Sequence, residues 1–332
     1  MHPTLPPALN ASRRVLDGRV GPLTVYVAGD GPPLVLIHSM NAAASAYEIK
    51  PIFEAMQSDR QVWAPDLPGF GLSDRTDRHY DRAMFVDAIE SVLDASYEST
   101  GERAVDVLAL SLSAEFVARL ALRRPECFRS LTLVNPTGFN ARAARNAAAA
   151  SASASASASA SATDHGRGAG TGDWAKDWGD TFEVPGLHAF LSCRLWTRGL
   201  FEALTSRPSI QFFLRGTFGA RAVDPGLMDY AWVASHQPGA RFAPLAFVCG
   251  RLFSRDVVAM YQALKLPVWM PHGVRGDFRD FSGADWARAK PNWTVESFAT
   301  GAFPHFEDPL GFASAYRRFL NGGPHLSAGS GP

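Results

Sequence analysis

Short apolar runs alternate with turns and helical patterns along the first 136 residues. Five of these runs are rich in β-branched residues and are bounded by glycine, proline or polar positions, as strands are. They are Leu23–Ala28, Leu34–His38, Val62–Pro65, Val105–Leu110 and Leu131–Asn135. Because helical patterns separate several of them, we expect right-handed crossovers and a mostly parallel sheet with helices on both faces.

Three segments carry signals of helices. In Met84–Tyr97 the apolar residues recur on one helical face, and Ser113–Arg124 shows the same spacing. Pro125 closes the second of these, because proline cannot continue a helix. Near the C-terminus, Asp308-Pro309 supplies an N-cap and a first helical residue, which predicts a final helix through Leu320.

The pattern breaks after residue 136. Ala141–Ala162 is almost entirely alanine and serine, and a glycine-rich stretch follows it. Such a tract cannot bury enough apolar surface to offset its ordering entropy, so we expect it to be flexible over 141–173. The aromatic segment 174–265 predicts a helical cap, after which Pro267–Met270 and Thr294–Phe298 resume the strand signal.

The predicted organisation is therefore one sheet domain with an insertion. The core comprises residues 1–136 and 266–321, the insertion covers 137–265, and a disordered tail occupies 322–332. In the simplest interpretation of the cap, aromatic residues such as Phe212 and Phe213 hold its helices together, while others face a pocket.

Composition excludes several classes of protein. Of 332 residues, 46% are hydrophobic and 19% charged, which is enough apolar material for a large core and argues against a disordered chain. Lys+Arg and Asp+Glu number 32 each, so no basic surplus favours a nucleic-acid partner. Three scattered cysteines suit neither a disulfide framework nor a metal site.

The N-terminal segment lacks a signal-peptide pattern, and no apolar run is long enough for a membrane span. We expect a soluble cytoplasmic protein without metal or cofactor.

Ser111 occupies the position with the strongest chemical signal. It lies between a predicted strand and a predicted helix, in the segment Ala109-Leu110-Ser111-Leu112-Ser113. Small residues two positions away on either side let the strand and helix backbones approach in a sharp turn, which lifts the central hydroxyl above the sheet edge. The segment resembles the nucleophile elbow of the α/β-hydrolase superfamily, with A-x-S-x-S in place of G-x-S-x-G.

Two upstream segments add to this resemblance. His38-Ser39-Met40-Asn41 resembles the oxyanion loop of the superfamily, and the octet from Asp66 to Ser73 matches its D-x-P-G-x-G-x-S scaffold turn. The resemblance implies an eight-stranded-type, mostly parallel sheet with an inserted helical cap. It also implies that the backbone N–H groups of Met40 and Leu112 form an oxyanion hole, while His38 is a structural residue.

A serine nucleophile needs a base, and the base needs an orienting carboxylate. Within the superfamily the chain order is serine, acid, histidine. The resemblance implies His305, which follows the last predicted strand, as the base, and Asp277 as the acid. Asp280 is an alternative acid, because Asp277 lies four residues beyond Gly273 and the family's acid usually lies about three beyond its strand's glycine. Asn135 follows another strand, at a position where some relatives carry the acid, but an amide cannot stabilise an imidazolium by charge.

The resemblance implies a serine hydrolase that cleaves a small apolar carboxylic ester through an acyl-enzyme intermediate. A thioester, an amide or a carbon–carbon bond is an alternative target on the same fold. A sensor that binds or slowly turns over a small ligand is an alternative of a different class. The aromatic cap predicts a small-molecule substrate with an apolar acyl or aryl group. The oligomeric state stays open.

Overall fold

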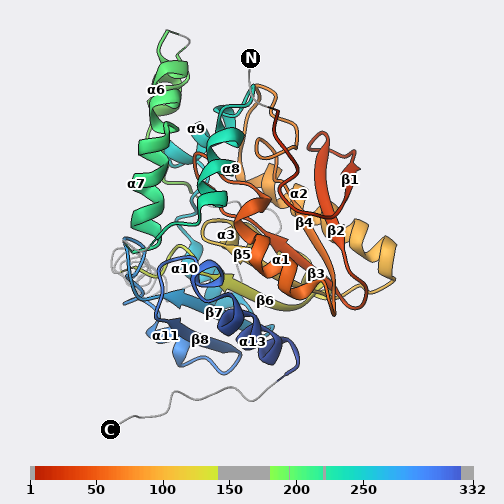
Figure 1. The fold of residues 1–332 in the computed structure, drawn as a ribbon. Coiled ribbons are helices and arrows are strands. Elements are labelled where there is room, and N and C mark those ends of the chain that lie inside the picture. Colours follow the sequence, from red (N-terminus) through yellow and green to blue (C-terminus); the bar gives the residue numbers. More distant parts are fainter. Residues whose placement is uncertain (1–3, 141–179, 194, 220–221, 323–332) are drawn as a thin grey trace, which may run out of the picture.

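The computed structural model describes residues 4–140, 180–193, 195–219 and 222–322. Eight strands form one sheet in the order β1-β2-β4-β3-β5-β6-β7-β8 (Figure 1). These strands are β1 (Ser12–Leu16), β2 (Leu23–Ala28), β3 (Pro33–Ile37), β4 (Gln61–Pro65), β5 (Val105–Leu110), β6 (Phe128–Val134), β7 (Val268–Gly273) and β8 (Trp293–Phe298). Only the pairings of β2 with β1 and β4 are antiparallel, so the prediction of a mostly parallel sheet is confirmed.

Helices cover both faces of the sheet, because the helical connections between parallel strands pack on its faces. One face carries α2 (Arg82–Thr100), α3 (Ser113–Arg123) with the short η2 (Pro125–Cys127) after it, α10 (Val257–Ala263) and α11 (Asp285–Arg288). The other carries η1 (Ala46–Ile49), α1 (Lys50–Met56), α12 (Pro304–Glu307) and α13 (Pro309–Leu320). Along β3, Val35 and Ile37 enter the first core and Leu34 and Leu36 the second, which follows from the two-residue repeat of a strand.

Local signals set the ends of several helices. The Asp81 carboxylate caps α2 by accepting from the Met84 N–H, and Gly101 ends the helix in the left-handed conformation at φ 72°. Asp308 accepts from the Gly311 N–H and Pro309 begins α13, so the predicted N-cap of the final helix is confirmed. α3 ends before Pro125, also as predicted.

A group of helices lies between β6 and β7 in the chain. They are α5 (Leu187–Leu191), α6 (Thr197–Leu204), α7 (Arg207–Thr217), α8 (Pro225–Ser235), α9 (Phe242–Val248) and α10. In Figure 1, α6 and α7 form an arm that extends away from the sheet. The alanine-serine tract at 141–173 and all but the first residue of the predicted tail lie outside the described residues, and the domain boundaries stay a prediction.

The interpretation of Phe212 and Phe213 as the residues that hold the cap helices together is wrong. Their side chains are 73% and 55% exposed and contact each other edge to face, with ring centroids 5.6 Å apart. The physical reason is the position of α7, which packs against α6 and α8 but projects from the sheet, so that Ile210 is its buried residue. In the described parts of the chain, no helix is both long and apolar enough to span a membrane.

Candidate active site

Ser111 sits in a strained turn at the end of a central strand. Its φ is 51°, in the left-handed region that side chains other than glycine rarely adopt. The turn is held by two backbone hydrogen bonds, from the Ser111 N–H to the Val134 carbonyl (2.9 Å) and from the Ala114 N–H to the Ser111 carbonyl (3.1 Å). The structure therefore confirms the predicted strand–turn–helix setting. A strained conformation persists only where surrounding bonds determine it, as they do here.

The small residues that flank Ser111 have the packing role expected of them. Ala109 is fully buried in β5 opposite Ile37 of β3. Ser113 is also fully buried, and its Oγ donates to the His38 carbonyl oxygen at 2.6 Å. The serine that replaces the family's glycine thus ties the start of α3 to the end of β3.

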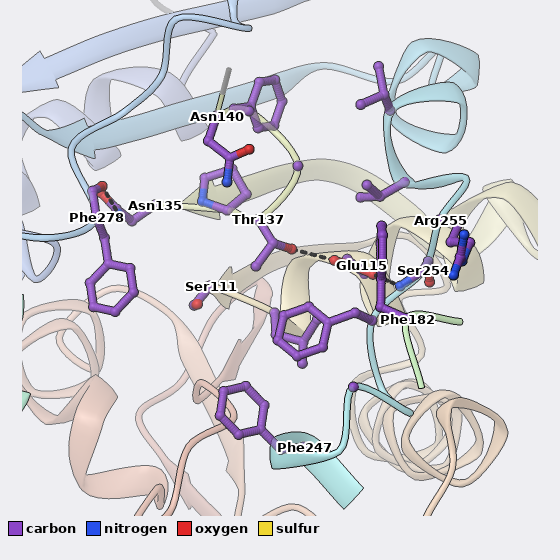
Figure 2. A pocket seen from close by; sticks show the side chains of 18 of the residues that line it. Ser111, Glu115, Asn135, Thr137, Asn140, Phe182, Phe247, Ser254, Arg255 and Phe278 are labelled. Carbon is purple, nitrogen blue, oxygen red and sulfur yellow. Dashed lines mark hydrogen bonds between the residues drawn. The ribbon is translucent and has the colours of Figure 1, made fainter. Parts of the chain in front are cut away.

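Ser111 opens onto a pocket of about 910 Å³ (Figure 2). The wall is largely apolar, and four of its aromatic side chains come from the segment between β6 and β7. These four are Phe139, Phe182, Phe247 and Phe253. The polar and charged residues of the lining are Ser111, Glu115, Asn135, Thr137, Asn140, Ser254, Arg255, Asp277 and Asp280. A pocket of this size and lining suits a small, mainly apolar ligand with a few polar contacts.

The loop after β3 is held rigidly by hydrogen bonds. The ring of His38 donates from Nδ1 to the Ser39 carbonyl (2.7 Å) and accepts the Leu67 N–H at Nε2 (2.9 Å). Both nitrogens are therefore engaged, and burial lowers the pKa of His38, in agreement with a structural role. The Glu48 carboxylate accepts from the Ser39 N–H (2.9 Å) and from Nδ2 of Asn41 (2.6 Å). Met40 is buried between these anchors and is not among the residues that line the pocket.

The octet that begins at Asp66 is a scaffold turn. The buried Asp66 carboxylate accepts the N–H groups of Ala46 (2.9 Å) and Leu72 (2.8 Å) and the Tyr26 hydroxyl (3.2 Å). Gly71 turns beside it at φ 50°. This carboxylate joins β2, β4 and η1, and it supports the site without taking part in it.

The two candidate acids both line the pocket with Ser111, and both are exposed. The Asp277 N–H donates to the Gly216 carbonyl at the end of α7 (3.0 Å), and the Asp277 carboxylate packs so closely that a Cβ on Gly216 would lie 2.2 Å from its Oδ2. Asp280 Oδ1 accepts from both the N–H and the hydroxyl of Ser282, at 3.1 and 2.6 Å.

Asn135 lies at the neighbouring strand end, also with a positive φ, of 48°. Its Nδ2 donates to the Phe278 carbonyl (3.0 Å) and its Oδ1 accepts the Gly273 N–H (3.1 Å). The amide therefore positions the segment that carries Asp277.

His305 lies apart from this group. It is 1% exposed in α12, its ring packs against Phe303, Phe306 and Phe312, and it is not among the residues that line the pocket. Its Nε2 lies 2.8 Å from the Glu48 carbonyl oxygen, while Nδ1 is buried with no hydrogen-bond partner in the described chain.

This arrangement fixes the proton on the His305 ring. A carbonyl can only accept, so Nε2 carries the hydrogen, whereas a base for Ser111 needs a bare Nε2. Burial lowers the pKa of His305 to about 4, partly offset by the bond to Glu48, so the ring is neutral at pH 7. The structure thus brings together Ser111, Leu112, Asp277 and Asp280, and it leaves His305 and Met40 outside the pocket lining.

Glu115 is a pocket residue that the sequence analysis missed. It follows Ser111 by four residues, is 2% exposed, and accepts the Thr137 hydroxyl (2.5 Å) and the Ser254 N–H (2.8 Å). Burial raises the pKa of Glu115 to about 7, although hydrogen bonds with Thr137 and with the backbone and side chain of Ser254 act in the opposite direction. The available signal was an acidic residue immediately beside the apolar positions of the predicted helix, one turn beyond the candidate nucleophile.

We expect Glu115 to make stability depend on pH. Its folded-state pKa of about 7 exceeds the ordinary value of 4.5, so the folded chain holds this proton more tightly than the unfolded chain. The resulting stability is complete below about pH 4.5 and is lost as pH rises through about 7, by about 3 kcal/mol. Urea unfolding of the wild type and of Glu115→Gln across this range measures the effect. As pH rises, the free energy of unfolding of Glu115→Gln should increase relative to that of the wild type. If the free energies of both proteins change in parallel with pH, Glu115 is not the group whose pKa is raised.

In the part of the chain that the structure describes, no group of three or more His, Cys, Asp or Glu residues is arranged to hold a metal ion. The pocket lining likewise offers acids, amides and hydroxyls but no cluster of histidine or cysteine ligands.

Comparisons with known proteins agree with this geometry. The family model described as alpha/beta hydrolase fold matches residues 32–164. A 2-hydroxymuconate semialdehyde hydrolase of Pseudomonas sp. (strain CF600) is 33% identical over 116 residues, which are 34% of this chain and 40% of that protein. The matched part of the chain thus spans less than half of this curated relative.

Solved structures show the same fold over nearly the whole chain. A serine hydrolase involved in carbazole degradation has a TM-score of 0.66 at 13% identity, covering 93% of this chain and 98% of that one. A carboxylesterase from Bacillus subtilis has a TM-score of 0.62 at 15% identity, covering 95% and 93%. The chain therefore has the α/β-hydrolase fold, and its residues 32–164 are similar to the model of that family.

Proposed function

We propose that this chain is a hydrolase in which Ser111 attacks an acyl carbon. The observation that carries the proposal is the left-handed turn that holds Ser111 at the end of β5, at the wall of a largely apolar pocket. A fold gains nothing in stability from this conformation at a non-glycine residue, whereas a nucleophile gains exposure from it.

Two backbone N–H groups support an oxyanion hole. In the described chain, the N–H groups of Met40 and Leu112 donate to no acceptor, so neither is committed to an internal partner, and of the two Leu112 lines the pocket. In the proposed reaction the Ser111 oxygen adds to the carbonyl carbon, its proton passes to a base, and the leaving group departs as the acyl-enzyme forms. Water then releases the acid. Each oxyanion donor would contribute about 3 kcal/mol to the transition state.

His305 is the base in this proposal. Its place after β8 and its neutral ring at pH 7 support the role, with Asp277 as the orienting acid and Asp280 as the alternative. The ring must first release the Glu48 carbonyl and carry its proton on Nδ1, because Nε2 now donates to that oxygen.

A carboxylic ester with an apolar acyl or aryl group is the substrate class that the pocket lining supports. A carbon–carbon bond beside a carbonyl is the second candidate. It is supported by the relative named as a 2-hydroxymuconate semialdehyde hydrolase, because such a semialdehyde contains no ester, thioester or amide to cleave.

The bond between His305 and Glu48 favours one further candidate. A chain that keeps Ser111 without a poised base would bind a small ligand in this pocket and turn it over slowly, as a sensor does.

Labelling with a fluorophosphonate separates these functions. We expect the wild type to gain one adduct on Ser111, found by peptide mass spectrometry, and to hydrolyse para-nitrophenyl esters with kcat/KM rising from acetate to butyrate as the pocket fills. Ser111→Ala should show neither. Adduct formation without turnover of any ester would favour the sensor, whereas no adduct on Ser111 would contradict the nucleophile itself.

A further inference from the structure

The Glu115 carboxyl joins three separate parts of the pocket wall. It projects from the first turn of α3, and its two oxygens accept hydrogen bonds from different elements (Figure 2). Oε1 accepts from the hydroxyl of Thr137, in the loop after β6, and Oε2 accepts from the N–H of Ser254, just before α10. The carboxyl therefore lies where core and cap segments meet, on the same pocket as Ser111.

This carboxyl retains capacity for a further donor. An ionised carboxylate has about four lone-pair sites, and its three hydrogen-bonding partners, the Thr137 hydroxyl and the N–H and hydroxyl of Ser254, are neutral. Its burial disfavours the charged form, and a ligand that donates to it would relieve that penalty.

Among the described residues, the charged groups near Glu115 interact with it through space, and their described hydrogen bonds go to other partners. Asp256, beside α10, disfavours the ionised form of Glu115 and is paired with Arg119 of α3 at 3.0 Å. Arg82 of α2 donates to the Ser254 hydroxyl at 3.2 Å. The ionised form of Glu115 in turn raises the pKa of the buried Tyr261 on α10.

Acidic groups outnumber basic ones around the pocket. Glu115, Asp277 and Asp280 line it, and Arg255 is the arginine among its lining residues. The Arg255 Nε donates to the Thr181 carbonyl at 2.7 Å, and its guanidinium lies over the Phe182 ring, 5.1 Å from the centroid. A carboxylate on a ligand would therefore meet more negative than positive charge.

We propose that Glu115 determines specificity by accepting a hydrogen bond from a hydroxyl on the part of the substrate remote from the scissile bond, and by disfavouring a carboxylate there. The substrate class is then a neutral, mainly apolar acyl compound that carries a hydroxyl group. This inference rests on the proposed function, because it assumes a substrate seated on Ser111.

Three boronic acids test the inference without turnover. Para-tolylboronic acid and its para-hydroxymethyl and para-carboxy counterparts share the reactive group, and their ring substituents differ in donor capacity and charge. The Ser111 oxygen adds to boron and its proton leaves to solvent, which gives a tetrahedral adduct that can be followed by calorimetry. Measurements belong at about pH 8, where Glu115 is mainly ionised.

We expect the hydroxymethyl compound to bind the wild type about tenfold more tightly than the tolyl compound, and the carboxy compound to bind most weakly. In Glu115→Gln these differences should shrink to within about threefold, whereas Glu54→Gln, on the exposed side of α1, should keep them. The order of the three affinities in the wild type tests the inference even if Glu115→Gln fails to fold. Equal binding of all three would overturn the role of Glu115 and leave Ser111 as the nucleophile; absence of binding by all three would contradict both proposals.

Discussion

Replacing Ser111 with alanine is expected to lower kcat/KM for a short apolar ester by at least about 10⁴-fold, because no other group at the turn can form the acyl-enzyme. The fold should survive, since both backbone hydrogen bonds of the turn use main-chain atoms. Steady-state kinetics with matched unfolding curves measure the two effects separately. Ser58→Ala, at an exposed position after α1, is the control and should leave the rate unchanged.

The His305→Ala variant extends this prediction to the base. If Ser111 and His305 act as one unit, the single variants and the double variant should lose similar amounts of activity. Losses that multiply in the double variant would show that His305 contributes by packing against Phe312 and binding the Glu48 carbonyl. The same comparison with Asp277→Asn and Asp280→Asn tells which carboxylate orients the ring. Substitution of the carboxylate that orients the ring should lower kcat/KM by several orders of magnitude.

Gly71→Ala is expected to destabilise the fold by more than about 4 kcal/mol, which exceeds the usual range for a point substitution. Gly71 adopts φ 50°, and a Cβ there would lie 1.9 Å from the Cγ of Asp66. Relief of that overlap would displace the carboxylate that holds β2, β4 and η1 together.

The matched control is Gly101→Ala, at the end of α2. Gly101 is also left-handed, at φ 72°, but nothing lies within 4 Å of the added methyl group. Only the conformational penalty should remain, at about 1–2 kcal/mol. Denaturant unfolding of both variants measures the difference, and equal losses would show that the contact with Asp66 is unimportant.

Local patterns predicted most of the sheet, and the failures have local causes. The edge strand β1 was missed because four of its five residues are exposed, so it has no apolar run or alternation to detect. β6 begins at Phe128, three residues before the predicted start, because the exposed Arg129 interrupts the apolar run. By contrast, Asp308 caps α13 through a contact within four residues, which sequence reasoning captures well.

In the site, too, features that depend on neighbours in the sequence could be predicted, whereas features that depend on distant contacts could not. The turn at Ser111 depends on neighbours in sequence, so its setting could be predicted. The orientation of His305 depends on the carbonyl of Glu48, 257 residues earlier, and the burial of Glu115 depends on Ser254, 139 residues later. Contacts of that range are made only when the elements pack, and no spacing along the chain encodes them.

In the described chain, the positive φ values outside glycine belong to Ser111 and Asn135, at the ends of the adjacent strands β5 and β6. At both positions glycine would relax the backbone, so selection for stability alone would favour it. Glycine at position 111 would also delete the proposed nucleophile. If Ser111 has that role, a homologue with glycine there marks a lineage freed from catalysis, and residue 111 records whether the proposed chemistry is under selection.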